Sequence, residues 1–217
     1  MLTILDNVRY YSFQMNQLWL FSEKQRDRSR FDIDGRVDFN YGIDSSWATG
    51  LDEGWGCGDY CVSLPQMYLE VGKGDFSLSV GKMFTTMGCD STYATERFFY
   101  GTSYECQTCA DYSAVIGRWD VNEKFSVFSG WTNGESRFFT DLNHNAFIRG
   151  VNWKILPRFQ VDYSISGGRN DGESKYLVSS LLGNLDLGKW DYTIIWLLRN
   201  VQSLETPGSD AVVSTQV

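Results

Sequence analysis

Charged side chains occupy every second position in one short stretch near the beginning of the 217-residue chain. The polar positions of this stretch are Asp32, Asp34, Arg36, Asp38 and Asn40. Carboxylates could bind a cation or work as a general acid and base. On one face of a strand, however, such positions lie ~6.6–7 Å apart, too far for one cation without ligands from other strands. We therefore expect these side chains to line water, with Arg36 balancing part of the acidic charge.

The positions between them are apolar or glycine: Phe31, Ile33, Gly35, Val37 and Phe39. Because side chains alternate between the two faces of a strand, one face is apolar and the other is charged. The stretch is about as long as a strand that crosses a membrane, roughly 9–11 residues. This pattern favours a wall between lipid and water. In a soluble β-sandwich, the same strand would bury its apolar face in a core and expose its charges.

Four of the cysteines form two close pairs in the sequence, Cys57 with Cys61 and Cys106 with Cys109, and Cys89 stands apart. The spacing within the pairs is near that of structural zinc sites. Outside the cytoplasm, however, such thiols are expected to form disulfides. We expect disulfides among the four, with the pairing left open, and assign no metal site. Free thiols and a zinc site are the alternatives, and an odd count leaves one cysteine unpaired within the monomer.

Patterns that would indicate catalysis or cofactor binding are weak. His144 is the sole histidine, and no Ser/His/Asp or Cys/His arrangement can be assembled around it. The glycine-rich stretch 54–58 is not followed by a helical pattern, so it does not match a phosphate-binding loop. We therefore predict a protein that is not an enzyme and needs no cofactor, with His144 as a solvated loop residue.

Composition narrows the class further. The net charge of −8 argues against a nucleic-acid partner, which requires a basic surface. Aromatic residues make up 16% of the chain, and they favour both strands and the girdles at membrane–water boundaries. No apolar run reaches ~18 residues, which excludes a transmembrane helix but leaves a β-barrel open. Residues 1–6 lack the features of a secretory signal, so we expect a processed protein or a fragment.

Period-two alternation recurs along the chain, and no segment has a sustained helical period. We expect ten strands, at residues 15–22, 31–40, 64–73, 76–86, 112–121, 124–133, 145–155, 158–167, 175–187 and 189–199. Tight turns alternate with long links, and the long links are 41–63, 87–111, 134–144 and 168–174. This rhythm is typical of an up-and-down barrel in the outer membrane, with short periplasmic turns and longer external loops.

The same alternation places both ends of the strand series on the long-loop side, because residues 200–217 read as the start of another long loop. Barrels of this kind begin and end in the periplasm, and an open sheet would expose unpaired edges to lipid. We therefore predict an all-β fold, one antiparallel transmembrane β-barrel domain over residues 1–217, truncated at both ends.

Two segments carry a resemblance to a known family. Residues 15–20, Met-Asn-Gln-Leu-Trp-Leu, are similar to the opening strand of the OmpL-like outer-membrane β-barrel porins. Residues 81–90, Gly-Lys-Met-Phe-Thr-Thr-Met-Gly-Cys-Asp, and the aromatic-rich residues 97–104 are similar to the most distinctive segment of that family. Three positions depart from the family pattern: Cys89, Asp90 and Gly101. The resemblance covers residues 14–199 and implies a water-filled barrel in the bacterial outer membrane.

We therefore predict a porin that passes small hydrophilic solutes by passive diffusion, with a mild cation preference from the acidic excess. The predicted lumen-facing residues are Asp32, Asp34, Arg36, Asp38, Asn40, Glu70, Arg118, Asp120 and Asp162. Lys82 and Arg149 instead share the apolar alternation of their strands. Lys82 would then snorkel or mark a register break, and Arg149 would mark a bulge.

The expected partners are the lipid bilayer and the solutes, and a homo-oligomer is compatible with the sequence. Two other functions stay open. A soluble β-sandwich could bind carbohydrate or peptide through loop tryptophans such as Trp47, Trp55 and Trp131. An outer-membrane enzyme or adhesin could be built on the same barrel, because fold alone does not decide function.

Overall fold

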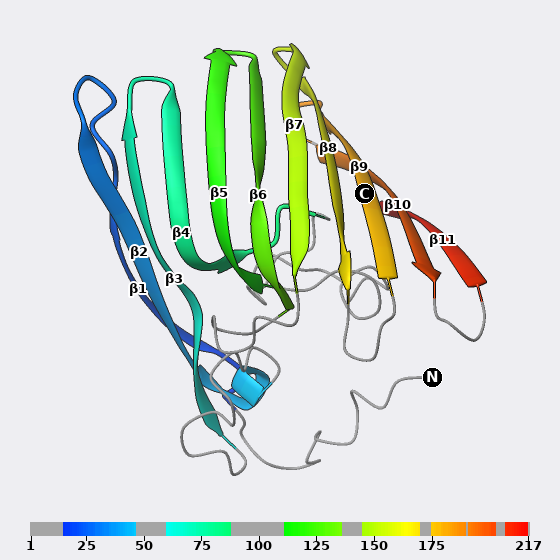
Figure 1. Cartoon of the computed structure of the whole chain (residues 1–217), viewed down its shortest axis with the longest axis horizontal. Coiled ribbons are helices and arrows are strands. Elements are labelled where there is room, and N and C mark those ends of the chain that lie inside the picture. Colours follow the sequence, from blue (N-terminus) through cyan, green and yellow to red (C-terminus); the bar gives the residue numbers. More distant parts are fainter. Residues whose placement is uncertain are drawn as a thin grey trace.

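The computed structural model describes residues 15–46, 60–87, 111–135, 145–169, 175–189, 191–202 and 207–216. These residues form one antiparallel sheet in which each strand pairs with its neighbours in the chain (Figure 1). The strands are β1 (Leu18–Lys24), β2 (Asp32–Gly42), β3 (Cys61–Lys73), β4 (Phe76–Phe84), β5 (Asp111–Asn122), β6 (Phe125–Glu135), β7 (Ala146–Leu156), β8 (Phe159–Arg169), β9 (Lys175–Asp186), β10 (Asp191–Gln202) and β11 (Pro207–Gln216). A short 3-10 helix, η2 (Ile43–Ser46), follows β2.

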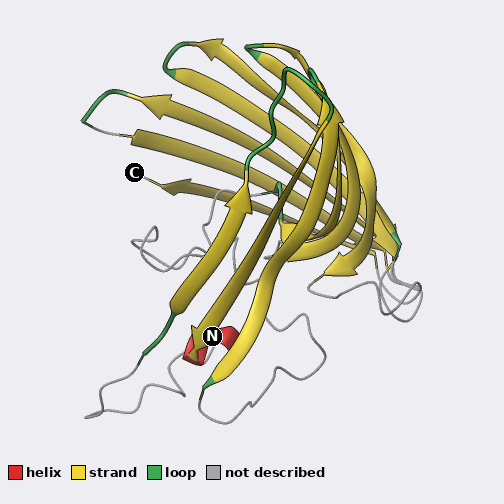
Figure 2. Cartoon of the chain, turned by 90° about the vertical axis from the view of Figure 1, so that its left-hand side faces the viewer, coloured by secondary structure: helices red, strands yellow, loops and turns green. Residues whose placement is uncertain are grey.

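The sheet is strongly curved (Figure 2), with β1 and β11 at its two edges. Short connections gather at one end, at the top of Figure 1, which we call the turn end. Their described residues are 25–31, 74–75, 123–124, 157–158 and 187–189. The other connections join the strands at the opposite end, the loop end. The links after β2, β4 and β6 are long, as predicted, but the link 25–31 at the turn end is longer than 170–174 and 203–206 at the loop end. The predicted alternation of short and long connections is therefore confirmed only in part.

The ten predicted strands are all present, with ends that differ from the prediction by a few residues. The stretch predicted at 145–155, for example, is β7 (Ala146–Leu156). One continuous sheet takes the place of the two stacked sheets that the sandwich alternative requires. In the described parts of the chain, no helix has the length and apolar character needed to cross a membrane.

An eleventh strand was missed, because residues 200–217 were predicted to be a loop. β11 pairs along its whole length with β10, from Pro207 opposite Gln202 to Gln216 opposite Thr193. Its sequence begins Pro-Gly and places two valines side by side, so it lacks the period-two pattern. Pairing with a neighbour, rather than intrinsic propensity, stabilises such a strand. Because β11 runs back to the turn end, the prediction that the strand series ends on the long-loop side is also wrong.

The two faces of the sheet differ in exposure as well as composition. One face, which we call the outer face, carries large apolar side chains that the protein leaves uncovered, including Leu20 at 63% exposure, Trp119 at 54% and Ile33 at 51%. Other exposed members of this face are Leu69, Val80, Trp153, Leu177, Ile194 and Trp196. An apolar surface of this extent marks a face that contacts a membrane or another protein. The opposite, inner face carries polar side chains that are buried, such as Asp38 and Ser180.

Candidate functional site: the inner face

Arg36 pairs with two carboxylates, those of Asp38 on its own strand and Glu23 on β1. Its guanidinium donates to both oxygens of Asp38, from Nε to Oδ1 at 2.7 Å and from Nη2 to Oδ2 at 3.2 Å. Its Nη1 also lies 3.3 Å from Glu23 Oε2 on β1. Asp38 is fully buried, and the Gln66 amide on β3 donates to its Oδ2 at 3.0 Å. These partners offset the cost of burying a carboxylate, which is large for an unpaired charge.

Asp34 and Asn40 extend from the same face of β2. Asp34 is half-buried and stands opposite Glu70 on β3. One Asp34 carboxylate oxygen is buried without a hydrogen-bond partner, whereas Glu70 accepts a bond from the Ser79 hydroxyl at 2.8 Å. Asn40 is buried, and its backbone carbonyl accepts a bond from Ser45 at 2.9 Å. Asp34 and Glu70 therefore form a locally negative pair near the turn end.

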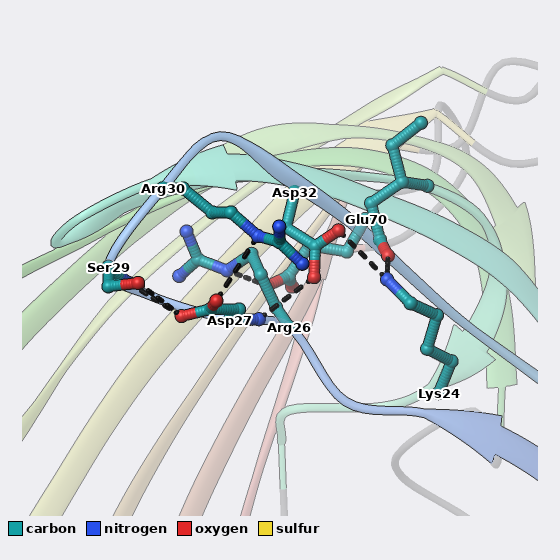
Figure 3. Close-up of polar contacts among 8 residues, drawn as sticks. Lys24, Arg26, Asp27, Ser29, Arg30, Asp32 and Glu70 are labelled. Carbon is teal, nitrogen blue, oxygen red and sulfur yellow. Dashed lines mark hydrogen bonds and ion pairs between the residues drawn. The ribbon is translucent and has the colours of Figure 1, made fainter.

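The link between β1 and β2 forms a polar cluster around Asp27 and Asp32 (Figure 3). Lys24 Nζ lies 2.9 Å from Asp32 Oδ1, and the Asp27 amide donates to the other Asp32 oxygen at 3.0 Å. Ser29 donates to Asp27 Oδ1 from its hydroxyl at 2.7 Å and from its amide at 2.9 Å, and Arg30 Nε lies 3.2 Å from Asp27 Oδ2. The hydrogen bonds from Ser29, more than the charge of Arg30, lower the pKa of Asp27 below its usual value.

The Arg26 side chain of this link points inward and contacts β3 and β4. Its side chain is only 6% exposed, with Nε 3.5 Å from Glu70 Oε1. Its Nη1 donates to the backbone carbonyl of Phe76 at 3.1 Å. The charge of Arg26 is thus buried against the carboxylate of β3, and Figure 3 shows the two side chains approaching each other.

Arg28 connects the link between β1 and β2 to strand β5. Its Nη1 lies 3.0 Å from Asp120 Oδ2 on β5, and its carbonyl accepts a bond from the Gly74 amide at 3.2 Å. Beside this contact lies a cavity of about 750 Å³ at the turn end. Charges of both signs line it, including Arg28, Arg118, Lys124, Lys154, Asp120 and Glu123. Arg118 also lies over the Phe128 ring, 5.8 Å from its centre.

Asp162 on β8 is held by amides rather than by a cation. The side-chain amide of Asn152 on β7 donates to its Oδ1 at 2.8 Å, and Gln160 donates to both of its oxygens, each at 2.8 Å. Ser126 on β6 donates in turn to Asn152 at 3.3 Å. Within the described residues Asp162 has no ion pair, so its negative charge is not neutralised.

Strand pairing brings all nine predicted lumen-facing residues to the inner face. Asp34 lies opposite Glu70, Glu70 opposite Ser79, and Ser79 opposite Ile116. The alternation of β5 from Ile116 places Arg118 and Asp120 on the same face. The remaining pairs continue this face through β6 and β7 to Asp162 on β8.

Sequence reasoning did not find the apolar part of the inner face, which lies toward the loop end. One cluster, on β5 to β7, comprises Tyr112, Ala114, Ile116, Phe128 and Ile148. The other comprises Met87 and residues of β9 and β10: Val178, Leu182, Ile195 and Leu197. The available signal was the loss of clean alternation, as at the adjacent Leu181 and Leu182, where both faces of β9 are apolar.

Both residues with conflicting alternation differ from prediction. Arg149 lies on the outer face, opposite Ser129 and Ile165, and β7 has no register shift at this position. The predicted bulge is therefore wrong, and the guanidinium lies over the Phe147 ring, 5.0 Å from its centre. Lys82 is fully buried, and β4 pairs with β3 and β5 without a register shift, so neither snorkelling nor a register break explains it.

Of the cysteines, only Cys61 falls within the described residues, and it is disulfide-bonded. Its partner and the other predicted loop residues, Cys57, Cys106, Cys109, His144, Trp47 and Trp55, lie outside them. Trp131 lies at the loop end of β6, and its indole N–H donates to Asn145 at 2.9 Å. In the described part of the chain, no group of three or more His, Cys, Asp and Glu side chains could hold a metal ion.

Comparison with known proteins identifies one family. Residues 4–211 match the family described as "Putative beta-barrel porin-2, OmpL-like". The match covers the sheet almost completely. A comparison with curated proteins finds no match.

Proposed function

The chain belongs to the OmpL-like β-barrel porin-2 family, and from this premise we propose that it forms a water-filled channel in the bacterial outer membrane. Small hydrophilic solutes would cross this channel by passive diffusion. The observation that carries the proposal is the contrast between the two faces of one sheet. The outer face leaves large apolar side chains uncovered, whereas the inner face gathers ionised groups from β1 to β8.

The described sheet would form the wall of a single barrel domain. Its edge strands, β1 and β11, would pair with each other or with further strands, because hydrocarbon cannot satisfy an open row of backbone groups. No catalytic step is required, since the proposed role needs only a hydrated path with charges along it.

A mild cation preference follows from the balance of charges on the inner face. Arg36 is shared between Glu23 and Asp38, while Arg26 and Arg28 each pair with one carboxylate. Two further carboxylates, those of Asp34 and Asp162, have no ion pair within the described residues, and Arg118 adds one further positive charge. Among these residues, six carboxylates stand against four guanidinium groups. This excess of negative charge favours cations near the wall.

The proposal is tested by reconstituting the chain in planar bilayers and measuring conductance and the reversal potential across a salt gradient. We expect discrete channels with a mildly cation-selective reversal potential. Asp162→Asn should reduce this selectivity, whereas Arg149→Gln, on the outer face, should leave it unchanged. An absence of channels would contradict the porin role, and anion selectivity would contradict the charge argument alone.

A further inference from the structure

The cavity at the turn end, which we call the turn-end cavity, has the size and polarity of a binding site for a hydrophilic ligand. Its volume is about 750 Å³, and ligand pockets in proteins typically measure roughly 300–1,000 Å³. Of the twelve residues that line it, only Phe125 is apolar. A ligand in this cavity would therefore contact charged groups and amides rather than hydrocarbon.

Two lysines line the turn-end cavity from neighbouring elements. Lys154 lies on β7, and its backbone amide donates to the carbonyl of Lys124, in the turn between β5 and β6, at 2.8 Å. This bond holds the two residues side by side. Neither ammonium group has an ion pair within the described residues. Like charges on neighbouring strands repel each other, so an anion bound between these two lysines would be stabilised by both.

A third cation, Arg118, lines the same cavity from the inner face of β5. Its guanidinium lies over the Phe128 ring, 5.8 Å from the ring centre, and has no carboxylate partner in the described part of the chain. Arg28 differs from it, because Arg28 is already paired with Asp120 at 3.0 Å. The cations that remain for a ligand are therefore those of Arg118, Lys124 and Lys154.

The carboxylates of the cavity lie closer to its edge than these cations do. Asp75 and Glu123 have no ion pair among the described residues. Asp75 lies in the turn between β3 and β4, and Glu123 lies in the turn between β5 and β6. Arg118 and Lys154, by contrast, lie within their strands. An anionic group is therefore favoured on the inner side of the cavity.

Side-chain amides supply further bonding positions. The Gln160 nitrogen donates to Asp162, but its carbonyl oxygen accepts no bond within the described residues. The Asn122 carbonyl oxygen accepts a bond from the Lys124 amide at 2.9 Å, and its nitrogen has no partner in the same part of the chain. One acceptor and one donor are thus available. A hydroxyl group can bind to either of them, because it both donates and accepts.

We propose that the turn-end cavity binds a small polyhydroxylated anion, a sugar that carries a phosphate or carboxylate group, and that such sugars are solutes of the channel. The anionic group would lie at Arg118, Lys124 and Lys154, and the hydroxyl groups at Asn122 and Gln160. The second part of this inference rests on the proposed function. It is compatible with a mild cation preference, because that preference follows from the charge of the whole wall, whereas binding depends on the groups of one cavity.

Isothermal titration calorimetry of the refolded protein tests the binding and requires no channel. Glucose 6-phosphate, glucuronate or both should bind, and the tighter of the two identifies the anionic group. Neutral glucose should not bind, and inorganic phosphate should bind more weakly than glucose 6-phosphate because it lacks the sugar hydroxyls. Glucose that binds as tightly as the anionic sugars, or no binding of any probe, would overturn the inference. Inorganic phosphate that binds as tightly as glucose 6-phosphate would overturn the assignment of a sugar.

Variants of the lining locate the site. Lys154→Gln and Arg118→Gln should each weaken binding about tenfold or more, as for the loss of one hydrogen bond to a charged group. Lys154→Arg keeps the charge and should retain binding. Lys189→Gln is the matched control, because Lys189 lies in the turn between β9 and β10 and does not line the cavity. All three side chains are exposed, so the variants should fold. Wild-type affinity in both Lys154→Gln and Arg118→Gln would overturn the site.

Planar bilayers test the second part of the inference. The sugar that binds should reduce the single-channel current at concentrations near its dissociation constant, and Lys154→Gln should require about tenfold more of it. Binding without any effect on an active channel would overturn this part. Active channels with no binding in calorimetry would overturn the whole inference and leave the proposed function intact. Binding without any channels would instead contradict the proposed function, and the binding site alone would stand.

Discussion

The guanidinium of Arg26 occupies the space that a side chain at Gly72 would fill. A Cβ built on Gly72 would meet Arg26 Nη1 and the Phe76 carbonyl at distances too short for real atoms. Gly72 lies on the inner face, opposite Asp32 and Ser77. The absence of a side chain at this position therefore lets the link between β1 and β2 fold inward.

Gly72→Ala should displace Arg26 and break its contact with Glu70. We expect the free energy of unfolding to fall by about 1–3 kcal/mol, as for other overpacked sites, measured by urea titration in lipid vesicles. Gly183→Ala is the matched control, because its Cβ would meet only Phe159 at an ordinary contact distance of 3.7 Å. Equal stability of the two variants would contradict the assignment.

Arg36→Ala should be strongly destabilising, because it removes the guanidinium that pairs with the fully buried Asp38. The expected loss is about 3–5 kcal/mol. Adding Asp38→Asn should recover part of it, since the buried charge is then removed. Lys24→Ala breaks a pair in which the lysine is 62% exposed, and should change stability by only about 0–1 kcal/mol. A small effect of Arg36→Ala in denaturant titrations would show that Asp38 is not buried as a charge.

Arg118→Gln should increase the cation preference of the channel, because it removes a positive charge from the lining of the turn-end cavity. The measurement is the reversal potential in a salt gradient. Asp162→Asn provides the opposite comparison and should shift the potential toward anions. Shifts in the same direction for the two variants would show that these side chains do not act on permeating ions through their charge.

Leu181→Arg tests whether the outer face contacts lipid. Leu181 is 37% exposed on that face, and an arginine near the bilayer midplane costs about 2–4 kcal/mol. We expect a smaller fraction of the Leu181→Arg variant to fold into lipid vesicles. A gel-shift assay measures this folded fraction. Gln160→Arg, on the inner face, places the same charge toward water and should fold normally. Normal folding of both variants would argue against lipid on the outer face.

Local pattern was sufficient for most of the strands. In β2, Ile33 and Asp34 differ so clearly in polarity that the alternation identifies both faces without any partner strand. The same holds for β8, where Tyr163 and Ser164 separate in the same way. The positions of most tight turns could also be predicted. Glycine residues such as Gly74, with a φ of 57°, mark turns because glycine adopts positive φ without steric cost.

Local sequence patterns did not predict contacts between residues far apart in the chain. β11 has no pattern of its own and exists as a partner of β10, and Arg149 follows the alternation of β7 although its charge suggested otherwise. Leu181 and Leu182 look alike in the sequence, yet one faces outward and the other packs against Met87.

Hydrophobic periodicity in the chain is therefore enough to specify ten of the strands described and most of their inward and outward positions, because these depend on neighbours within a few residues. Which side chains fill the interior, and where the chain crosses it, depends on the curvature of the whole sheet. Thr86 reaches Ser164 across 78 positions of sequence, a contact that is set by the path through space and leaves no periodic trace in the residues themselves.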